Sequence, residues 1–189
     1  MDALAPRRAR PTASSWSRRA PRGDHSERVA RYAGELGRAL GLPPQHLRRL
    51  VHAARLHDVG KESVPDRILL KPGRLTKEEF AVVRQHSTVG ERMVRAAGEA
   101  DIATWIRHHH ERWDGSGYPD GIAGTDIPLE SRILAAVDSL DAMTTHRSYS
   151  MAITFEDAAR EIEANAGTQF DPEVARVLVE MIDEESLPA

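Results

Sequence analysis

Two short runs of polar residues carry side-chain types that bind metal ions and support phosphate-ester hydrolysis. The first is His57-Asp58-Val59-Gly60-Lys61, and the second is His109-His110-Glu111-Arg112-Trp113-Asp114-Gly115-Ser116-Gly117-Tyr118-Pro119. Imidazole nitrogens and carboxylate oxygens are ligands for borderline and hard divalent cations. Adjacent histidines before a glycine-rich turn, with a His-Asp pair far upstream, predict a metal-dependent phosphohydrolase.

The apolar pattern around these runs predicts helices that carry the polar residues on their inward faces. The stripe within residues 47–54 continues onto His57 and Asp58, and the stripe within 102–106 continues onto His109 and His110. Further inward positions are His25 before the stripe at 29–40, His86 one turn after Val83, and Asp138 within the stripe at 134–141. Nothing alternates with a period of two for long enough to form a strand. We therefore expect an all-α, compact multi-helix bundle with the metal site in its core.

Helix starts are marked by residues that cap the free backbone N–H groups. Asp24 with Glu27 and Thr76 with Glu79 have the spacing of capping boxes, and we expect Phe80 to face inward on the second of these helices. Two later starts are expected at Thr154 with Asp157 and at Asp171-Pro172. His46, His52, His108 and His146 lack the context of the other histidines and are predicted to be surface or structural residues.

Composition limits the remaining classes of protein. The chain of 189 residues is predicted to contain one domain, residues 24–189, after a disordered Arg/Pro-rich tail at 1–23; an arm for a polyanionic partner is the alternative for this tail. A net charge of −3 predicts no nucleic-acid binding, and the lack of a long apolar run predicts no membrane insertion, hence a cytoplasmic protein. With no cysteine, the metal ligands must be histidines and carboxylates, which favour Mn, Fe, Zn or Mg.

A single inward histidine is most often a hydrogen-bonded core residue, but this set would leave several buried polar groups unpaired. A pair of cations explains the set better. Asp58 could bridge two ions, and a bridging hydroxide formed near neutral pH would be the nucleophile. Lys61 could then neutralise charge on the phosphate. The Gly-Ser-Gly-Tyr-Pro turn is either a tight loop or the mouth of the site.

These motifs resemble the HD-GYP family, a branch of the HD phosphohydrolase superfamily. The resemblance runs from Asp24 to the C-terminus and includes the two polar runs, His86 with Gly90, residues 132–138, Asp141-Ala142-Met143-Thr144, and Gly167-Thr168-Gln169-Phe170-Asp171-Pro172. It implies an all-helical phosphodiesterase that hydrolyses cyclic di-GMP to linear pGpG, with GMP as an alternative end product. Fe or Mn is the expected metal.

The resemblance also implies roles for individual residues. Asp58 would bridge two ions, with His57 and Asp138 on one and His86, His109 and His110 on the other; His25 is a further expected ligand. Lys61 would contact the scissile phosphate, Arg147 would hold a substrate phosphate, and Tyr118 would line the substrate side. The glycine-tyrosine-proline loop is also the expected contact for partner diguanylate cyclases (GGDEF proteins).

Three departures from the family pattern leave alternatives open. Pro21 replaces a glutamate that supports a third metal in some members, which favours a binuclear site. Ser150 replaces a second arginine, so we expect weaker substrate binding that Ser150→Arg would restore. Only the Arg/Pro tail precedes the domain, so we expect a stand-alone protein or one whose input comes from a partner such as a response regulator. The alternatives to the enzyme are a weakly active cyclic di-GMP-sensing or cyclase-docking module, and a hydrolase for another cyclic dinucleotide.

Overall fold

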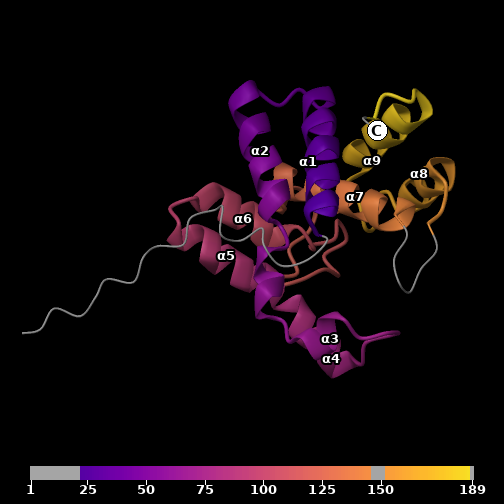
Figure 1. Ribbon diagram of the computed structural model, residues 1–189. Coiled ribbons are helices and arrows are strands. Elements are labelled where there is room, and N and C mark those ends of the chain that lie inside the picture. The colour runs from indigo at the N-terminus through magenta and orange to yellow at the C-terminus, as the bar shows by residue number, and fades with distance from the viewer. Residues whose placement is uncertain (1–21, 146–151, 188–189) are drawn as a thin grey trace, which may run out of the picture.

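The computed structural model describes residues 22–145 and 152–187, and these residues form helices without a strand, which confirms the all-α prediction (Figure 1). The helices are α1 (Arg22–Ala39), α2 (Pro44–Leu56), η2 (Val59–Ser63), α3 (Asp66–Leu69), α4 (Lys77–Arg84), α5 (His86–Ala96), α6 (Ala100–His108), η3 (Gly124–Asp126), α7 (Leu129–Thr144), α8 (Phe155–Ala164) and α9 (Pro172–Asp183).

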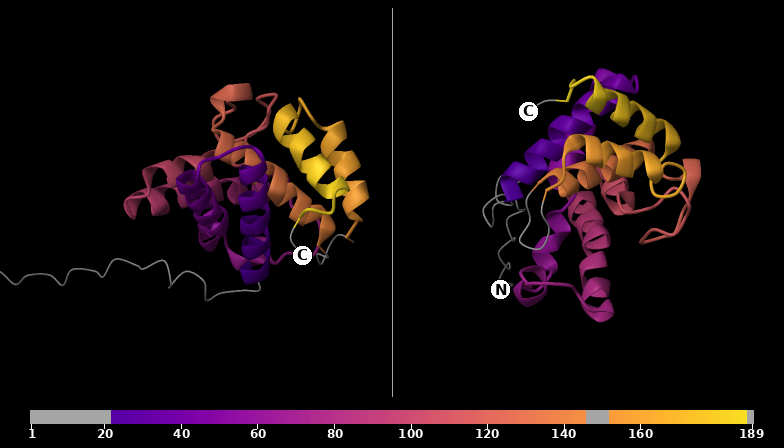
Figure 2. Two further views of the ribbon diagram at one scale, coloured as in Figure 1. Left: turned by 90° about the horizontal axis from the view of Figure 1, so that it is seen from above. Right: turned by 90° about the vertical axis from the view of Figure 1, so that its right-hand side faces the viewer.

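Helix α7 lies in the centre and contacts α1, α6, α8 and α9 (Figures 1 and 2). Around it, α1 packs on α2, α5 on α6 and α8 on α9. The core is made of aliphatic side chains from the inward stripes, including the fully buried Leu36, Leu50, Ile106 and Leu134. Each stripe runs toward a polar residue at its end, so packing of the aliphatic face fixes where that polar residue lies.

Three of the four predicted helix starts are confirmed. Thr76 and Glu79 form a reciprocal capping box, and the Thr154 side chain accepts from the Asp157 backbone N–H at 3.1 Å. The Asp171 carboxylate accepts from the N–H groups of residues 173 and 174 at 2.8 and 3.3 Å. These side chains satisfy backbone donors that have no partner inside the helix.

One predicted helix start and one predicted inward residue were wrong. Helix α1 begins at Arg22, so Asp24 lies within its first turn, and Glu27 accepts from Arg55 instead of closing a capping box. Phe80 is 47% exposed, and its helix α4 projects with α3 from the rest of the bundle (Figure 1). Its ring lies edge-on to Tyr118, with 6.4 Å between ring centres.

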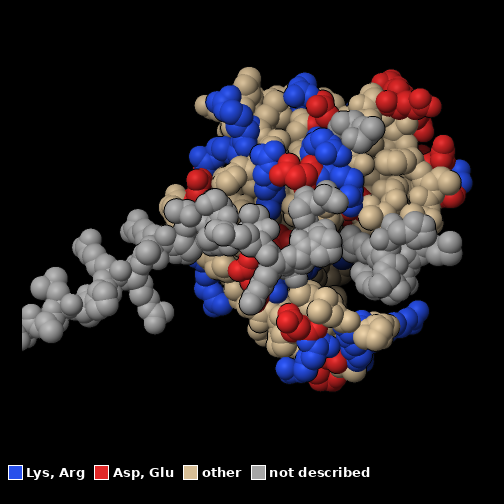
Figure 3. Space-filling model, in the orientation of Figure 1, with Lys and Arg blue, Asp and Glu red and all other residues tan. Residues whose placement is uncertain are grey.

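The surface carries both charge signs. Figure 3 shows Lys and Arg side chains interspersed with Asp and Glu on one face, with acidic side chains gathered at the C-terminal end of α9. No helix of the described part of the chain is long and apolar enough to cross a membrane. Residues 1–21 and 146–151 lie outside the described residues, and with them most of the predicted tail and the predicted roles of Arg147 and Ser150.

Candidate metal centre

Three histidines share one local geometry at helix ends. Each is buried, and each ring Nδ1 lies within hydrogen-bond distance of the backbone carbonyl three residues earlier. The pairs are His57 with Ala54 at 2.6 Å, His86 with Val83 at 2.7 Å and His109 with Ile106 at 2.6 Å. A carbonyl can only accept, so Nδ1 carries the hydrogen, and in the neutral ring Nε2 is left as a bare acceptor.

These bare acceptors point at one another. The Nε2 atoms of His86 and His109 are 3.4 Å apart, and His57 Nε2 is buried with no hydrogen-bond partner among the described residues. Burial lowers the pKa of His86 and holds that of His109 well below its usual range, the latter helped by neighbouring imidazoles. The His86 and His109 rings are therefore neutral at pH 7, and their facing lone pairs repel unless a cation lies between them. This donor set fits metal ions.

The potential ligands fall into two groups of three. His86, His109 and His110 form one group, and His25, His57 and Asp58 form the other; within each group the ligand atoms lie within 4.8 Å of one another. Ligands at about 2.1 Å from a shared ion are roughly 3 to 4 Å apart. A small movement of the side chains toward one another would therefore let each group hold one cation.

Asp58 lies between the two groups. Its Oδ2 is 3.6 Å from His57 Nε2. Its Oδ1 is 3.7 Å from His86 Nε2 and accepts no hydrogen bond from the residues that the structure describes. Lys61 Nζ donates to Oδ2 at 2.7 Å. Although burial opposes ionisation, Lys61, His57 and His86 hold the pKa of Asp58 well below its usual value. An ionised carboxylate that faces both groups can bridge two cations.

Asp138 completes the second group from α7. Its Oδ1 is 3.3 Å from His25 Nε2 and 3.8 Å from His57 Nε2. Burial opposes ionisation here as well, but the hydrogen bond from His25 and the nearby His57 ring hold the pKa of Asp138 well below its usual range. Asp138 is thus an ionised carboxylate on the side of His57, where its oxygen is available to a cation.

His25 is held by a carboxylate behind it. Asp141, whose side chain is 1% exposed, pairs with His25 Nδ1 at 2.5 Å and with Arg28 Nε at 2.5 Å. Arg28 also donates to Thr145 Oγ1 at 3.1 Å. A carboxylate that binds the rear nitrogen of an imidazole fixes the ring and directs the other nitrogen to the site. The sequence placed Asp141 on the inward stripe without predicting this role.

The glycines beside the ligands are required by close backbone contact. A Cβ on Gly60 would lie 1.9 Å from the His86 carbonyl oxygen and 2.7 Å from the Gly90 nitrogen. Glycine at 60 therefore lets η2 pack directly on α5, and this contact brings His57 and Asp58 to His86. Similarly, a Cβ on Gly117 would lie 2.4 Å from the Arg112 nitrogen, so the second glycine of the loop allows it to fold back on itself.

The loop after His110 is fixed by Glu111, which sequence reasoning missed. Glu111 is buried, and its carboxylate accepts from the backbone N–H of Asp120 at 2.7 Å and of Gly121 at 3.0 Å. Tyr118 then stacks on His110, with 4.9 Å between ring centres, and burial raises the pKa of the Tyr118 hydroxyl. The Gly-Ser-Gly-Tyr-Pro turn is thus both a tight loop and one edge of the candidate site.

The same loop is bonded to the turn between α8 and α9. The backbone N–H groups of Trp113 and Asp114 donate to the carbonyls of Gln169 and Thr168 at 3.2 and 2.9 Å. Arg112 also donates to the Gln169 side chain at 2.7 Å. The GTQFDP stretch of the sequence therefore supports the loop, and its Asp171 both caps α9 and pairs with Arg132.

The predicted site residues within the described part of the chain come together. His25, His57, Asp58, His86, His109, His110 and Asp138 surround one centre, and Lys61 and Tyr118 border it. Arg147 lies outside the described residues. The histidines left out of the site have structural partners where contacts are described: His46 pairs with Glu130 and His108 with Asp120.

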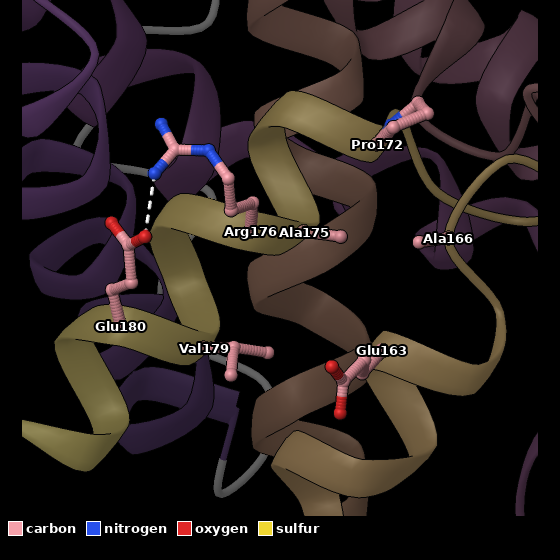
Figure 4. Close-up of a pocket in the computed structure, with 7 residues that line it drawn as sticks. All are labelled: Glu163, Ala166, Pro172, Ala175, Arg176, Val179 and Glu180. Atoms are coloured by element: carbon pink, nitrogen blue, oxygen red, sulfur yellow. Dashed lines mark hydrogen bonds and ion pairs between the residues drawn. The ribbon is translucent and has the colours of Figure 1, made fainter.

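A pocket between α8 and α9 offers none of this chemistry (Figure 4). It is lined by Glu163, Ala166, Pro172, Ala175, Arg176, Val179 and Glu180. Arg176 is already paired with Glu180 at 2.6 Å, and no imidazole lines the pocket. We assign the candidate site to the histidine and aspartate cluster instead.

Comparison with known proteins agrees with this geometry. The HD domain family matches residues 11–174. The chain is 42% identical over 163 residues to the cyclic di-GMP phosphodiesterase of Thermotoga maritima, covering 83% of this chain and 44% of that protein. It is 41% identical over 156 residues to the cyclic di-GMP phosphodiesterase response regulator RpfG of Xanthomonas campestris. This match covers 81% of this chain and 41% of that protein. A third similar protein is the 3'3'-cGAMP-specific phosphodiesterase 2 of Vibrio cholerae, which is 39% identical over 170 residues. This match covers 86% of this chain and 32% of that protein. The chain thus spans less than half the length of these relatives.

Solved structures share the fold. Bd1817, an HDG"Y"P protein from Bdellovibrio bacteriovorus, superposes with a TM-score of 0.70 at 19% identity, covering 85% of this chain and 52% of that one. The cyclic GMP-AMP phosphodiesterase V-cGAP3 of V. cholerae superposes with a TM-score of 0.67 at 20% identity, covering 86% and 44%.

Proposed function

Because this chain belongs to the HD domain family, in its HD-GYP branch, we propose that it is a metal-dependent phosphodiesterase that hydrolyses cyclic di-GMP to linear pGpG. The observation that carries the proposal is the position of the Asp58 carboxylate between the Nε2 atoms of His57 and His86, with His109 Nε2 3.4 Å from His86 Nε2. Relatives named as phosphodiesterases support the substrate class.

The proposed ion sites follow the two groups. His86, His109 and His110 would hold one divalent ion, His57 and Asp138 the other, and Asp58 both, with His25 as a further ligand of the second ion. We propose iron or manganese, which these nitrogen and oxygen donors suit. When bound, two such ions supply an activated water and neutralise charge on the phosphate.

The chain's own residues would bind and orient the diester. Lys61 carries its ammonium group 2.7 Å from Asp58, at the edge of both ion sites, and would contact the scissile phosphate, while Arg147 would hold a second phosphate. Tyr118 would form the wall beside His110. In the reaction, the oxygen of water bonds to phosphorus and the P–O3′ bond breaks. The leaving 3′-oxygen takes a proton, and linear pGpG results; GMP would require a second hydrolysis.

The test is hydrolysis by anaerobically loaded protein. We expect Fe(II)- or Mn(II)-loaded wild type to convert cyclic di-GMP to pGpG or GMP in a chromatographic assay. Asp58→Ala should abolish turnover, and Asp183→Ala, an exposed aspartate at the end of α9, should not. Metal content and circular dichroism of each variant separate loss of the centre from loss of the fold. No product from wild type with two ions per chain would refute the activity.

Two alternative functions have specific support. The relative from V. cholerae named as 3'3'-cGAMP-specific makes a different cyclic dinucleotide the second candidate substrate. Ser150, in place of a second arginine, favours a weakly active module that senses cyclic di-GMP or docks a diguanylate cyclase through the Tyr118 loop. Turnover of 3'3'-cGAMP but not cyclic di-GMP would select the first, and binding of cyclic di-GMP without turnover would select the second. We also propose response-regulator partners, because the relative RpfG is itself named as a response regulator.

A further inference from the structure

An arginine that no motif singled out lies beside the candidate site. Arg84 is the last residue of α4, two residues before His86, and its guanidinium carbon is 4.3 Å from the centre of the Tyr118 ring. The Tyr118 ring in turn stacks on His110 at 4.9 Å with 28° between the ring planes. One aromatic ring therefore separates the Arg84 cation from a proposed metal ligand.

Two aromatic side chains lie beside the Arg84 guanidinium. Phe80, one turn earlier on α4, lies edge-on to Tyr118 and 5.9 Å from the Arg84 guanidinium carbon. A guanidinium that lies over a ring uses its planar face, and its N–H donors point outward from its edges. The two aromatic side chains thus contact the cation through its charge and accept no hydrogen bond that is described for it.

Arg84 differs in this respect from the other arginines near the site. Those arginines are committed to polar partners: Arg28 to Asp141, Arg107 to Asp120, Arg112 to Gln169 and Arg132 to Asp171. Among residues 22–145 and 152–187, no carboxylate or other acceptor contacts the Arg84 guanidinium, and the residue is exposed. A cation that packs on two rings and has N–H donors unused among the described residues can bind an anion that comes from solution.

We propose that Arg84 is a substrate-binding residue that donates to the non-scissile phosphate of a cyclic dinucleotide while the other phosphate lies at the metal centre. The inference rests on the proposed function and adds a contact to it. A cyclic dinucleotide carries two phosphodiesters in one ring, so the second one must lie within a short distance of the first. The paired N–H donors of an arginine guanidinium match the oxygens of a phosphate in charge and geometry.

The test compares two substrates on the Mn(II)-loaded protein. Arg84→Met keeps an apolar stem against Tyr118 but removes the charge and the donors, and Arg84→Lys keeps the charge without the fork. We expect Arg84→Met to lower kcat/KM for cyclic di-GMP on the order of tenfold or more, with Arg84→Lys intermediate. For bis(p-nitrophenyl) phosphate, which has a single phosphate, kcat/KM should stay within about twofold of wild type. Arg48→Met is the matched control, since Arg48 is exposed at the far end of α2.

Each outcome decides the assignment. Equal cyclic di-GMP kinetics in wild type and Arg84→Met would overturn it while leaving the proposed function in place. Equal losses on both substrates would show that Arg84 only positions Tyr118, and would overturn the phosphate contact. A loss for cyclic di-GMP but not for 3'3'-cGAMP, which has the same phosphate backbone, would assign Arg84 to a base and also overturn it.

A positive result has a signature that a structural role would not produce. The wild-type kcat/KM should fall more steeply with ionic strength than that of Arg84→Met, because one ion pair with substrate is removed. If wild type binds cyclic di-GMP without turnover, the same comparison is made on Kd by calorimetry. If wild type cleaves bis(p-nitrophenyl) phosphate but neither binds nor cleaves a cyclic dinucleotide, the proposed function fails and this inference fails with it.

Discussion

Replacing Asp141 by asparagine isolates the charge that holds His25, because the two side chains have nearly the same shape. The Asp141 carboxylate is 1% exposed and pairs at 2.5 Å with both His25 and Arg28. A neutral amide would remove the charge of Asp141 from its contact with Arg28 and turn an N–H group toward one of the two donors. We expect Asp141→Asn to lower the unfolding free energy of the metal-free protein by about 2–4 kcal/mol. This is slightly below the cost for a fully buried pair, because Arg28 is 26% exposed.

The unfolding free energy lost in Asp141→Asn should be larger at low pH than at high pH. Burial opposes protonation of His25, but hydrogen bonds to Asp138 and Asp141 outweigh it and raise the pKa of His25 from 6.5 to about 9. Since the pKa is higher in the folded state, protonation of His25 stabilises the metal-free fold. That contribution is complete below pH 6.5 and is lost as the pH rises through 9. Asp141→Asn removes one of the two carboxylates, so its stability should decline less over this interval than that of wild type.

Urea unfolding of metal-free protein at pH 6, 7.5 and 9.5 measures both effects. Asp157→Asn is the control, because Asp157 also pairs with an arginine, Arg160, but both side chains are exposed. This control should change stability by less than about 1 kcal/mol. Calorimetry with Mn(II) should show affinity about 10- to 100-fold weaker for Asp141→Asn. If Asp141→Asn matched wild type in stability and in Mn(II) affinity, the reasoning about Asp141 would be wrong.

Three other predictions test the supports of the centre. Gly60→Ala places a Cβ 1.9 Å from the His86 carbonyl, so we expect it to cost about 3 kcal/mol or more in urea unfolding and to weaken Mn(II) binding; unchanged values would exclude the close contact. Glu111→Gln weakens the bonds to the N–H groups of Asp120 and Gly121, so kcat/KM should fall while metal content by mass spectrometry stays the same; equal kinetics would refute the loop's role. For each independent site, Mn(II) at 100 times its Kd should stabilise wild type by about 2.7 kcal/mol in a thermal or urea experiment, and no stabilisation would argue against a site specific to the folded state.

The inward position of the proposed ligands could be predicted from the apolar helical stripes beside them. Positions three or four residues apart face the same way, so the stripe that ends at residue 54 placed His57, and the stripe that ends at 106 placed His109 and His110. The structure adds the contacts that suit these rings to bind a cation. Their Nδ1 atoms pair with carbonyls at the ends of helices, and this pairing depends on where each helix stops, the least predictable feature of a helix.

Contacts between distant segments could not be read from the stripes. Phe80 was placed in the core because it is apolar and helical, whereas α4 projects from the bundle and leaves the ring at the side of Tyr118. Arg84 looks like an ordinary charged residue at a helix end until Tyr118, 34 positions later, is seen beneath it. Glu111 was part of the quoted motif, but its role appears only when the loop folds back to it.

The bonds between the loop and the α8–α9 turn bear on how short a functional piece of this chain can be. Every proposed metal ligand occurs by Asp138, so a gene shortened after α7 would still encode the whole ligand set. Such a fragment would lack the backbone acceptors at Thr168 and Gln169 that receive the loop's N–H groups. It would also uncover the face of α7 on which α8 and α9 pack. We therefore expect a working unit to extend at least to the end of α9, some forty-five residues beyond the last proposed ligand.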